Sequence, residues 1–491
     1  MSKLPDGWDV GRFGDIVSVI RGVTFPASSK VNEPSHDVIA CLRTAHIQDR
    51  LKWDDVYFIP KRFMRKDEQI TRRNDILMSM ANSASLVGKV CINESDETAC
   101  FGAFLAAIRC EQINFKYAYY FLRSASTLAN LRAGASQTTN IANISVSELE
   151  KLEVPLAPLG EQKRIALTLD ALLAQVDAIR ARIDAIPGII KRFRESVLRD
   201  AVSGRLTEAW RSAHPEMTAQ RLLHDFSPLP PPPRYKSRSD AHIMGVCATS
   251  IGKPKSPLVE AWEWVPLVQI ARMESGHTPS RDVSSYWNGD IPWIGIKDAR
   301  ANHEGTIYST QQSTNQSGLD NSAARLLPAG TVCISRTASV GYVVKMGVPM
   351  ATSQDFVNWV PTQYVDAEWL KWLFVAEKES LFRFGKGSTH TTIYFPEWLS
   401  LHIALPHIDE QIEIARRVQE LLALADNMVE RVNDAKKRID ALTQSILAKA
   451  FRGELVPQDP NDEPASVLLE HIRAQRAAAP KPKRGRKAAD N

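Results

Sequence analysis

Residues 159–173 read LGEQKRIALTLDALL, and residues 408–422 read IDEQIEIARRVQELL. The two segments lie 249 residues apart, and the same offset pairs Ile165 with Ile414 and Gly204 with Gly453 without a gap. A match that keeps one offset over about 45 residues, polar positions included, indicates a duplication.

The duplicated segments are predicted to be helical, because their apolar residues recur at alternating intervals of four and three. The first copy carries Ile165, Leu169, Leu172, Val176, Ile179 and Ile183, and the second carries Ile414, Val418, Leu421, Ala425, Met428 and Val432. The two stripes are copies, so we expect each to bury the other in an intramolecular antiparallel pair. Packing of each helix on the core of its own domain is the alternative. Pro187-Gly188 stands in the first copy alone, where it should kink or break the helix.

The segments ahead of each copy correspond more loosely, with offsets that drift between 252 and 254. The matched residues are Trp8, Ile16 and Gly22 with Trp262, Ile270 and Gly276; Phe104, Tyr117 and Tyr120 with Phe356, Trp369 and Trp372; and Gln137-Thr138-Thr139 with His390-Thr391-Thr392. Short β-prone runs alternate there with helical aromatic spacing, as at residues 115–122 and 367–374. The predicted fold class is α/β. Two α/β domains are joined by two long helices that form an antiparallel coiled coil, in a pseudo-two-fold, nearly circular arrangement.

This organisation gives six segments. We expect a first variable unit at residues 1–153, a helical region at 154–208, a Pro-rich linker at 209–257, a second variable unit at 258–403, a second helical region at 404–456, and a tail at 457–491 that is basic and disordered at its end.

Composition restricts the class of protein. Lys and Arg exceed Asp and Glu by 61 to 56, a net charge of +5 that permits nucleic-acid binding without demonstrating it. Six cysteines without a C-x-x-C pair argue against a zinc ribbon or a disulfide framework and favour reduced thiols. No apolar leader or membrane-length apolar stretch is present, so a soluble cytoplasmic protein with no membrane contact is expected.

The motifs of common catalytic sites are absent from the sequence. It contains no phosphate-binding G-x-x-x-x-G-K-[ST], no dinucleotide G-x-G-x-x-G after a strand, no H-E-x-x-H, and no G-x-S-x-G. Its eleven histidines lack metal-ligand spacing, and Glu161 and Glu410 stand at predicted helix starts, where a structural role is favoured. We therefore expect no catalytic residue, no metal and no cofactor.

Several motifs resemble one known family. Residues 275–280 read SGHTPS, residues 286–294 read YWNGDIPWI, and Lys297-Asp298 follow. Residues 336–341 (RTASVG), 387–392 (GSTHTT), 158–162 (PLGEQ) and 453–460 (GELVPQDP) add to the pattern. Together they resemble the specificity (S) subunit of type I restriction–modification systems across nearly the whole chain. The first variable unit lacks the Tyr-Trp…Pro-Trp element.

The resemblance implies a noncatalytic reader of double-stranded DNA. Each variable unit would be a target-recognition domain that reads half of an asymmetric, interrupted sequence. The paired helices would act as a ruler and dock two methyltransferase subunits, which methylate adenine N6. Restriction subunits would join them for ATP-dependent cleavage.

Candidate DNA-binding residues lie in polar turns that follow predicted strands or in polar loops. In the first unit they are Arg43, Thr44, His46, Ser79, Asn82, Gln137, Thr138 and Thr139, and in the second they are Lys297, Asp298, Arg336, Ser339, Gln354, His390 and Thr391. Such turns also cap local backbone groups, which is the structural alternative. The basic run Lys61, Arg62, Arg65, Lys66, Arg72 and Arg73 is either a DNA-backbone contact or a solvated face. Trp8, Trp262, Trp287 and Trp293 are expected in the core rather than stacked on bases.

Two other classes of function remain open on the residues alone. A self-contained methyltransferase–nuclease would need the motifs that are missing. A nucleic-acid-binding coiled-coil scaffold outside restriction–modification needs no such motif. Sequence selection by the complex separates the scaffold from a specificity subunit.

Overall fold

The structure is a computed structural model, and it describes residues 4–137, 141–230, 257–337, 339–382, 385 and 391–478. It divides into two units. Unit 1 comprises residues 1–184 and 433–491, and unit 2 comprises residues 185–432. The polyproline run at 230–233 lies mostly, and the basic residues 481–487 wholly, outside the described residues.

Unit 1 is built on four small sheets, with strand orders β1-β12, β2-β9-β5-β7, β4-β3-β8 and β10-β11-β6. Its strands are β1 Asp9–Arg12, β2 Ser18–Arg21, β3 Val38–Leu42, β4 Tyr57–Pro60, β5 Ile76–Ser79, β6 Ala81–Asn82, β7 Val90–Ile92, β8 Ala99–Phe101, β9 Leu105–Arg109, β10 Ser136–Gln137, β11 Ala142–Asn143 and β12 Glu153–Leu156. Its shorter helices are α1 Phe13–Ile16, α2 Phe115–Arg123, α3 Ala125–Gly134, α4 Val146–Glu150 and α15 Ala465–Ala478.

Unit 2 repeats this plan with sheets β13-β22, β14-β21-β18-β19-β16 and β17-β15-β20. Its strands are β13 Glu263–Pro266, β14 Ala271–Ser275, β15 Trp287–Ile294, β16 Thr306–Ile307, β17 Gln312–Thr314, β18 Val332–Ser335, β19 Val343–Met346, β20 Ala351–Thr352, β21 Phe356–Pro361 and β22 His402–Leu405. Its shorter helices are α6 Glu208–Ala213, α7 Ala219–Leu222, α8 Leu267–Ile270, α9 Ile296–Ala301, α10 Gln316–Asp320, α11 Ala367–Ala376, α12 Lys378–Phe382 and α13 Phe395–Leu399.

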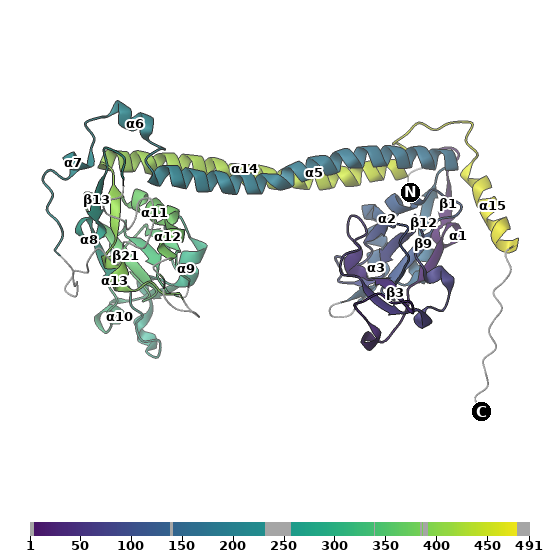
Figure 1. Ribbon diagram of the computed structural model, residues 1–491, viewed down its shortest axis with the longest axis horizontal. Helices are drawn as coiled ribbons and strands as arrows, with labels where there is room; N and C mark the ends of the chain where they lie inside the picture. The colour runs from purple at the N-terminus through teal and green to yellow at the C-terminus, as the bar shows by residue number, and fades with distance from the viewer. Residues whose placement is uncertain are drawn as a thin grey trace. The chain divides into compact units, whose positions relative to one another are not determined.

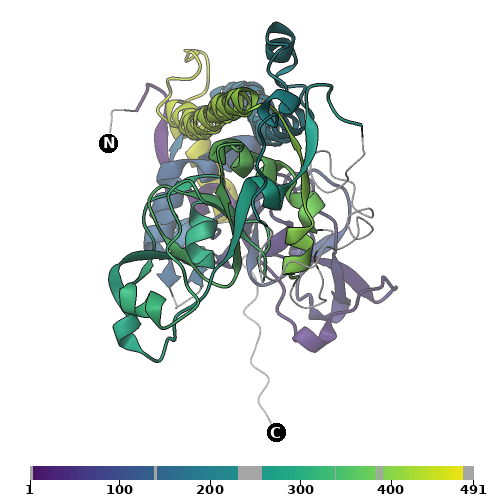
Figure 2. The same cartoon turned by 90° about the vertical axis from the view of Figure 1, so that its left-hand side faces the viewer.

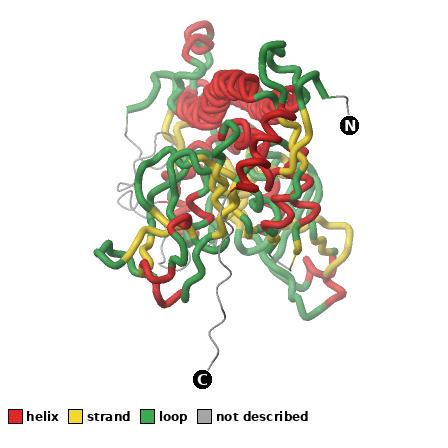
Figure 3. The backbone as a smooth tube through the Cα atoms, turned by 90° about the vertical axis from the view of Figure 1, so that its right-hand side faces the viewer, coloured by secondary structure: helices red, strands yellow, loops and turns green. Residues whose placement is uncertain are grey.

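Two helices of 44 residues each, α5 Leu159–Val202 and α14 Ile408–Phe451, pass from one unit into the other and lie side by side (Figure 1). In unit 1, Arg180 pairs with Asp440 at 2.6 Å and Asp184 pairs with Lys436 at 2.6 Å. The partner number falls as the α5 number rises, so the helices are antiparallel, as the duplicated stripes predict. In each unit they lie along one side of the sheets (Figures 2 and 3).

The helix pair differs from the sequence prediction at two points. Ile179 and Met428, predicted in the seam, are 48% and 43% exposed. Two facing helices bury little more than one row of side chains, here Val418, Ala425, Val432 and Ile439 on α14. Pro187 was predicted to kink or break the helix, and α5 does not break there, because it remains helical through this residue. Loss of one N–H near the middle of a helix that is paired along its length is insufficient to end it.

A buried carboxylate ties the start of each long helix to the core of its unit. Trp8 donates its indole N–H to Glu161 at 2.9 Å, and Trp262 donates to Glu410 at 3.0 Å. Both carboxylates are almost fully buried, at 1% and 0% exposure. The structural role expected for these two glutamates is confirmed. Trp8, Trp262 and Trp293 are buried as predicted, and Trp287 is half-buried.

In the described part of the chain, no helix is long and apolar enough to cross a membrane. Cysteines 41, 91, 100, 110 and 333 are free thiols there, and Cys247 lies outside the described residues.

Candidate nucleic-acid interface

The same backbone contacts gather the same loops in each unit. In unit 1, Gly102 N donates to Leu42 O at 2.9 Å and Met80 N donates to Phe104 O at 2.8 Å. The equivalent bonds in unit 2 are Ser353 N to Ile294 O at 3.0 Å and Arg336 N to Asp355 O at 2.7 Å. The ends of β3, β5 and β8 therefore meet in unit 1, as the ends of β15, β18 and β20 meet in unit 2. Most of the candidate DNA-binding residues lie on these loops.

Arg43, Thr44 and His46 follow β3. Arg43 is half-buried, and its guanidinium donates to Asp55 O at 2.9 Å and to the Asp55 carboxylate. His46 is 3% exposed, and its Nδ1 accepts the Arg43 backbone N–H at 2.9 Å. Burial lowers the pKa of His46, so the ring stays neutral and keeps this acceptor. Thr44 is half-buried beside the same turn.

Ser79 ends β5 and is buried at 1% exposure, whereas Asn82 on β6 is half-buried. Asn82 Nδ2 donates to Ser79 Oγ at 3.4 Å, and its Oδ1 accepts the Ser83 N–H at 2.8 Å. Gln137 ends β10. Strand β11 lies between β10 and β6, and its Ala142 pairs with Gln137 on one side and with Asn82 on the other. The structure thus brings the two predicted polar loops of unit 1 into one sheet. Thr138 and Thr139 lie outside the described residues.

In unit 2, Lys297 and Asp298 lie on α9, directly after β15. Lys297 is exposed, but Asp298 is 6% exposed, and its carboxylate accepts the N–H groups of Gly295 at 3.0 Å and Gln311 at 2.8 Å. Asp298 holds the turn after β15 as His46 holds the turn after β3. The two residues are structural equivalents with different chemistry.

Arg336 and Ser339 follow β18. Arg336 is half-buried, its guanidinium lies 4.4 Å from the centre of the Phe395 ring, and burial lowers its pKa. The Ser339 carbonyl accepts the Ser335 hydroxyl at 2.5 Å. Ser335 also accepts Tyr342 N–H at 2.8 Å, so this turn is held from both sides.

Gln354 lies in the turn between β20 and β21, where it is exposed and accepts the Thr278 hydroxyl. Thr391 is half-buried next to Thr392, which pairs with Thr337. The turn after β18 therefore adjoins residues 391–392. His390 lies outside the described residues.

Two pairings inferred from the sequence duplication are wrong. Leu105 begins β9 and Phe356 begins β21, so Phe356 corresponds to Leu105 and not to Phe104. Ile144 N bonds to Met80 O at 2.8 Å, and Ile393 N bonds to Arg336 O at 2.9 Å. If Ile393 is equivalent to Ile144, then Thr391 and Thr392 are equivalent to Ala142 and Asn143. They are not equivalent to Thr138 and Thr139.

Sequence reasoning did not predict the exposed ring of Phe104 or the cations that lie against the rings of Tyr57, Trp287 and Trp293. Phe104 is 64% exposed at the β8–β9 turn, and Tyr57 lies beneath the cations Lys30 and Arg43. In unit 2, the Arg281 guanidinium lies 5.4 Å and 5.6 Å from the ring centres of Trp287 and Trp293. Phe104 follows Gly102-Ala103 between two short strands, a pattern that predicts a turn but not an exposed ring.

The six basic residues between positions 61 and 73 of unit 1 are all exposed. Lys61 donates to His36 O at 2.7 Å, and Arg73 pairs with Asp96 at 2.8 Å. Two of these basic side chains therefore already bind neighbouring protein groups. The run is still either a DNA-backbone contact or a solvated face.

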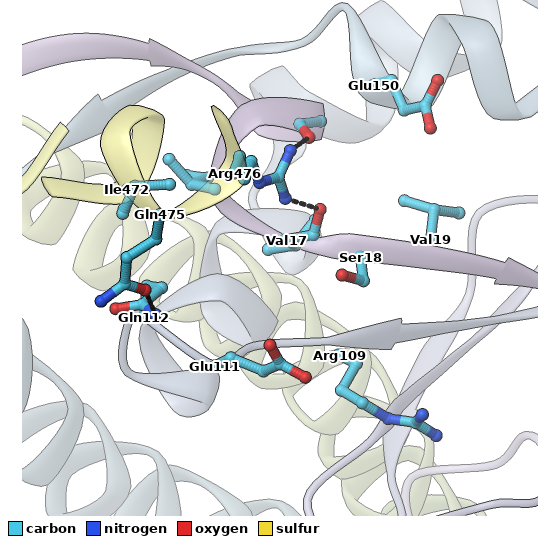
Figure 4. A pocket seen from close by; sticks show the side chains of 12 residues that line it. Val17, Ser18, Val19, Arg109, Glu111, Gln112, Glu150, Ile472, Gln475 and Arg476 are labelled. Atoms are coloured by element: carbon cyan, nitrogen blue, oxygen red, sulfur yellow. Dashed lines mark hydrogen bonds between the residues drawn. The ribbon is translucent and has the colours of Figure 1, made fainter. Parts of the chain in front are cut away.

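A separate cavity in unit 1 lies between β2, β9 and α15 (Figure 4). Arg476 of α15 donates to Gly14 O at 2.6 Å and to Val17 O at 2.8 Å, and Arg109 pairs with Asp75 at 2.7 Å. Both arginines already bind protein groups, and the hydrogen bonds of Arg476 attach α15 to the segment between β1 and β2.

A family model supplies the identification. The model described as the type I restriction modification DNA specificity domain matches residues 5–187 and 259–435, which is most of both units. The chain belongs to the type I restriction–modification specificity subunits. Members of this family are noncatalytic components of their systems, so the prediction of a nonenzymatic subunit is confirmed.

Two specificity subunits are similar along their whole length. The EcoKI specificity subunit of Escherichia coli K12 is 29% identical over 521 residues, with 99% of each chain covered. The StySPI specificity subunit of Salmonella potsdam is 30% identical over 512 residues, also with 99% of each chain covered.

Two solved structures show the same fold. One comes from work on complex assembly and conformational transition of the type I R-M system, and it covers 93% of this chain and 100% of its own, with a TM-score of 0.60 and 17% identity. The other is the HsdS subunit from Thermoanaerobacter tengcongensis, which covers 92% of this chain and 98% of its own, with a TM-score of 0.52 and 18% identity. The predicted fold class is therefore confirmed for this specificity subunit.

The loops that gather in each unit of this specificity subunit depend on one close backbone approach. A Cβ on Gly22 would lie 2.1 Å from Gly102 O, and a Cβ on Gly276 would lie 1.9 Å from Ser353 O. We expect Gly22→Ala or Gly276→Ala to push the two loops apart and cost at least about 1–3 kcal/mol, measured by urea unfolding. Gly188→Ala is the matched control, because nothing lies within 4 Å of its added Cβ in α5. Equal stability of all three variants would contradict the prediction.

Proposed function

We propose that this subunit recognises an asymmetric bipartite DNA target through two target-recognition domains, residues 1–153 and 258–403. Each domain reads one half, and an unread gap separates the halves. The residues proposed to lie at the DNA are Arg43, Thr44, Asn82, Gln137, Lys297, Arg336, Ser339, Gln354 and Thr391. Thr138, Thr139 and His390 lie outside the described residues and are proposed from the sequence alone. His46, Ser79 and Asp298 act as positioning residues, since their side chains are buried.

One observation carries this proposal. The two units hold the same loops with the same backbone bonds, but they place different side chains at equivalent positions, such as Phe104 and Asp355. A shared scaffold with changed loop chemistry is what two readers of different sequences require. Phosphate contacts from basic residues would supply affinity, and base-edge contacts would supply sequence choice.

The helical regions 154–208 and 404–456 are proposed to fix the separation of the two readers and to dock two methyltransferase subunits. Those subunits would methylate adenine N6, and restriction subunits would join for ATP-dependent cleavage, all in the cytoplasm. The residues 209–257 would link the two halves. Membership of the type I specificity family supports these roles, because such subunits act with DNA and with methyltransferase and restriction subunits.

A domain exchange tests the proposal. Residues 1–153 are replaced by the corresponding domain of another specificity subunit, and the chain is expressed with its methyltransferase subunits. Sequencing of methylated adenines should show one half of the target changed and the other half intact. The subunit alone should methylate no DNA.

Three outcomes would contradict the proposal. Methylation by the isolated chain would make it an enzyme, and a complex without any sequence preference would favour a scaffold. Loss of both half-sites after the exchange, in a complex that still assembles, would argue against modular reading.

A further inference from the structure

The turn between β8 and β9 presents an aromatic ring to solvent on a fixed backbone. Phe104 is 64% exposed, while its carbonyl accepts the Met80 N–H at 2.8 Å. Leu105 N donates to Gly102 O at 2.8 Å, which closes the turn. The ring therefore projects from the point where the loops after β3, β5 and β8 meet.

Phe104 also forms one wall of an apolar pocket. Val23, Phe25, Tyr57 and Ala103 line it as well, around a cavity of about 480 Å³. Phe25 and Tyr57 meet edge to face with ring centres 5.9 Å apart, which holds these two walls in one arrangement. The walls of the cavity are mainly apolar.

Two cations stand at the rim of this pocket. The Lys30 ammonium lies 4.9 Å from the centre of the Tyr57 ring, and the Arg43 guanidinium lies 5.6 Å from it. Lys30 and Arg43 both line the cavity. An apolar pocket with cations at its rim fits a partner that carries an apolar group next to a negative charge. DNA is such a partner, because its phosphates lie beside its bases.

The equivalent place in unit 2 has the opposite chemistry. Ser353, Gln354 and Asp355 replace Gly102, Ala103 and Phe104 there, as the paired backbone bonds show. The side chain of Gln354 accepts the Thr278 hydroxyl. The pocket is therefore a feature of the first reader alone and not of the shared scaffold.

We propose that the pocket walled by Phe104, Phe25 and Tyr57 receives the C5-methyl edge of a thymine in the first half of the target. The methyl group is the one apolar group that base edges present in the major groove, and apolar side chains are its usual partners. Lys30 contacts a neighbouring phosphate, while the guanidinium of Arg43 is paired with the Asp55 carboxylate at the rim. The inference rests on the proposed function. It adds the identity of one base in the target and the pocket that contacts this base.

Deoxyuridine tests this assignment, because it lacks only the C5-methyl of thymine. Once the target is known from methylated adenines, each thymine of the first half is replaced in turn by deoxyuridine in a duplex. Binding of the full chain with its methyltransferase subunits is then measured. One replacement should weaken binding about fourfold, the worth of one buried methyl. With Phe104→Ala, the binding of unmodified DNA should weaken and the deoxyuridine effect should vanish.

Tyr308→Ala is the matched control, since Tyr308 is a similarly exposed aromatic residue, at 67%, in unit 2. It should leave the deoxyuridine effect unchanged. Phe104→Leu, which keeps an apolar wall, should retain part of the effect. If no thymine of the first half responds in the wild-type complex, or if the effect survives in Phe104→Ala, the assignment is overturned. A complex that selects no sequence at all would instead defeat the proposed function.

Discussion

Glu410→Gln is expected to destabilise unit 2 by about 3 kcal/mol, while Glu161→Gln should leave unit 1 unchanged or slightly more stable. Glu410 accepts the Trp262 indole N–H at 3.0 Å and the Thr207 hydroxyl at 2.7 Å, and it forms an ion pair with Arg211. The Arg211 side chain is only 14% exposed. Neutralising Glu410 would leave that guanidinium buried without a counter-charge, which is the costly way to break such a pair.

Glu161 occupies the equivalent position without an equivalent cation. It accepts the Trp8 indole N–H at 2.9 Å, and within the described ranges no lysine or arginine forms an ion pair with it. A glutamine keeps an oxygen for the Trp8 N–H and removes a charge that burial disfavours. The two variants are matched, because they make the same change at duplicated sites.

Hydrogen exchange along the full chain measures this contrast, because local protection reports each unit separately. Reduced protection in unit 2 of Glu410→Gln, with unit 1 of Glu161→Gln unaltered, is the expected result. Comparable losses in both variants would show that Arg211 does not govern the difference.

The same site predicts a pH dependence for unit 1. Burial raises the pKa of Glu161 above its ordinary value of 4.5, so the folded state binds the proton more tightly than the unfolded state. The contribution of this group to stability is therefore full below about pH 4.5 and declines as pH rises through its raised pKa. The urea concentration at the unfolding midpoint of the wild type, relative to that of Glu161→Gln, should decrease as the pH rises above about 4.5. A constant difference would contradict this assignment.

Much of the fold follows from the sequence because the duplication is long and its polar positions are kept. The helices expected at 115–122 and 367–374 correspond to α2 and α11, and the two duplicated segments pair as antiparallel helices. Periodicity is less informative about burial in a pair of helices. It placed Ile179 and Met428 in the seam, although only part of each stripe has a facing surface to bury it.

The loops were harder to predict for a different reason. Sequence similarity aligned the Thr-Thr pairs at 138–139 and 391–392, whereas backbone hydrogen bonds align Ile144 with Ile393 and so shift that pairing by four residues. The polar type of a residue also did not distinguish side chains that could contact DNA from side chains that support the loop backbone. His46 and Asp298 are polar residues after strands, but their side chains are committed to backbone N–H groups.

Inserting four residues into both long helices is expected to lengthen the unread gap of the target by one to two base pairs. The insertions go after Asp184 in α5 and before Lys436 in α14, which keeps that 2.6 Å pair together. Four residues add about 6 Å of rise and about 40° of rotation beyond a full turn. One DNA base pair adds about 3.4 Å of rise and about 34° of rotation. The rotation of the four-residue insertion therefore matches one base pair, and its rise matches nearly two.

A seven-residue insertion into both helices is the informative comparison. It preserves the apolar spacing of the helix pair, but its rise and rotation do not match those of a whole number of DNA base pairs. They add about 10 Å, or roughly three base pairs, which turn by about 100°, while the coil itself turns by only about 20°. We expect the seven-residue variant to fold and bind methyltransferase subunits, yet to methylate no site with a lengthened gap. Mapping methylated adenines distinguishes the two insertions. If the four-residue variant assembles and keeps the original gap, the helices do not set the spacing, since a rigid spacer must move its readers when it grows.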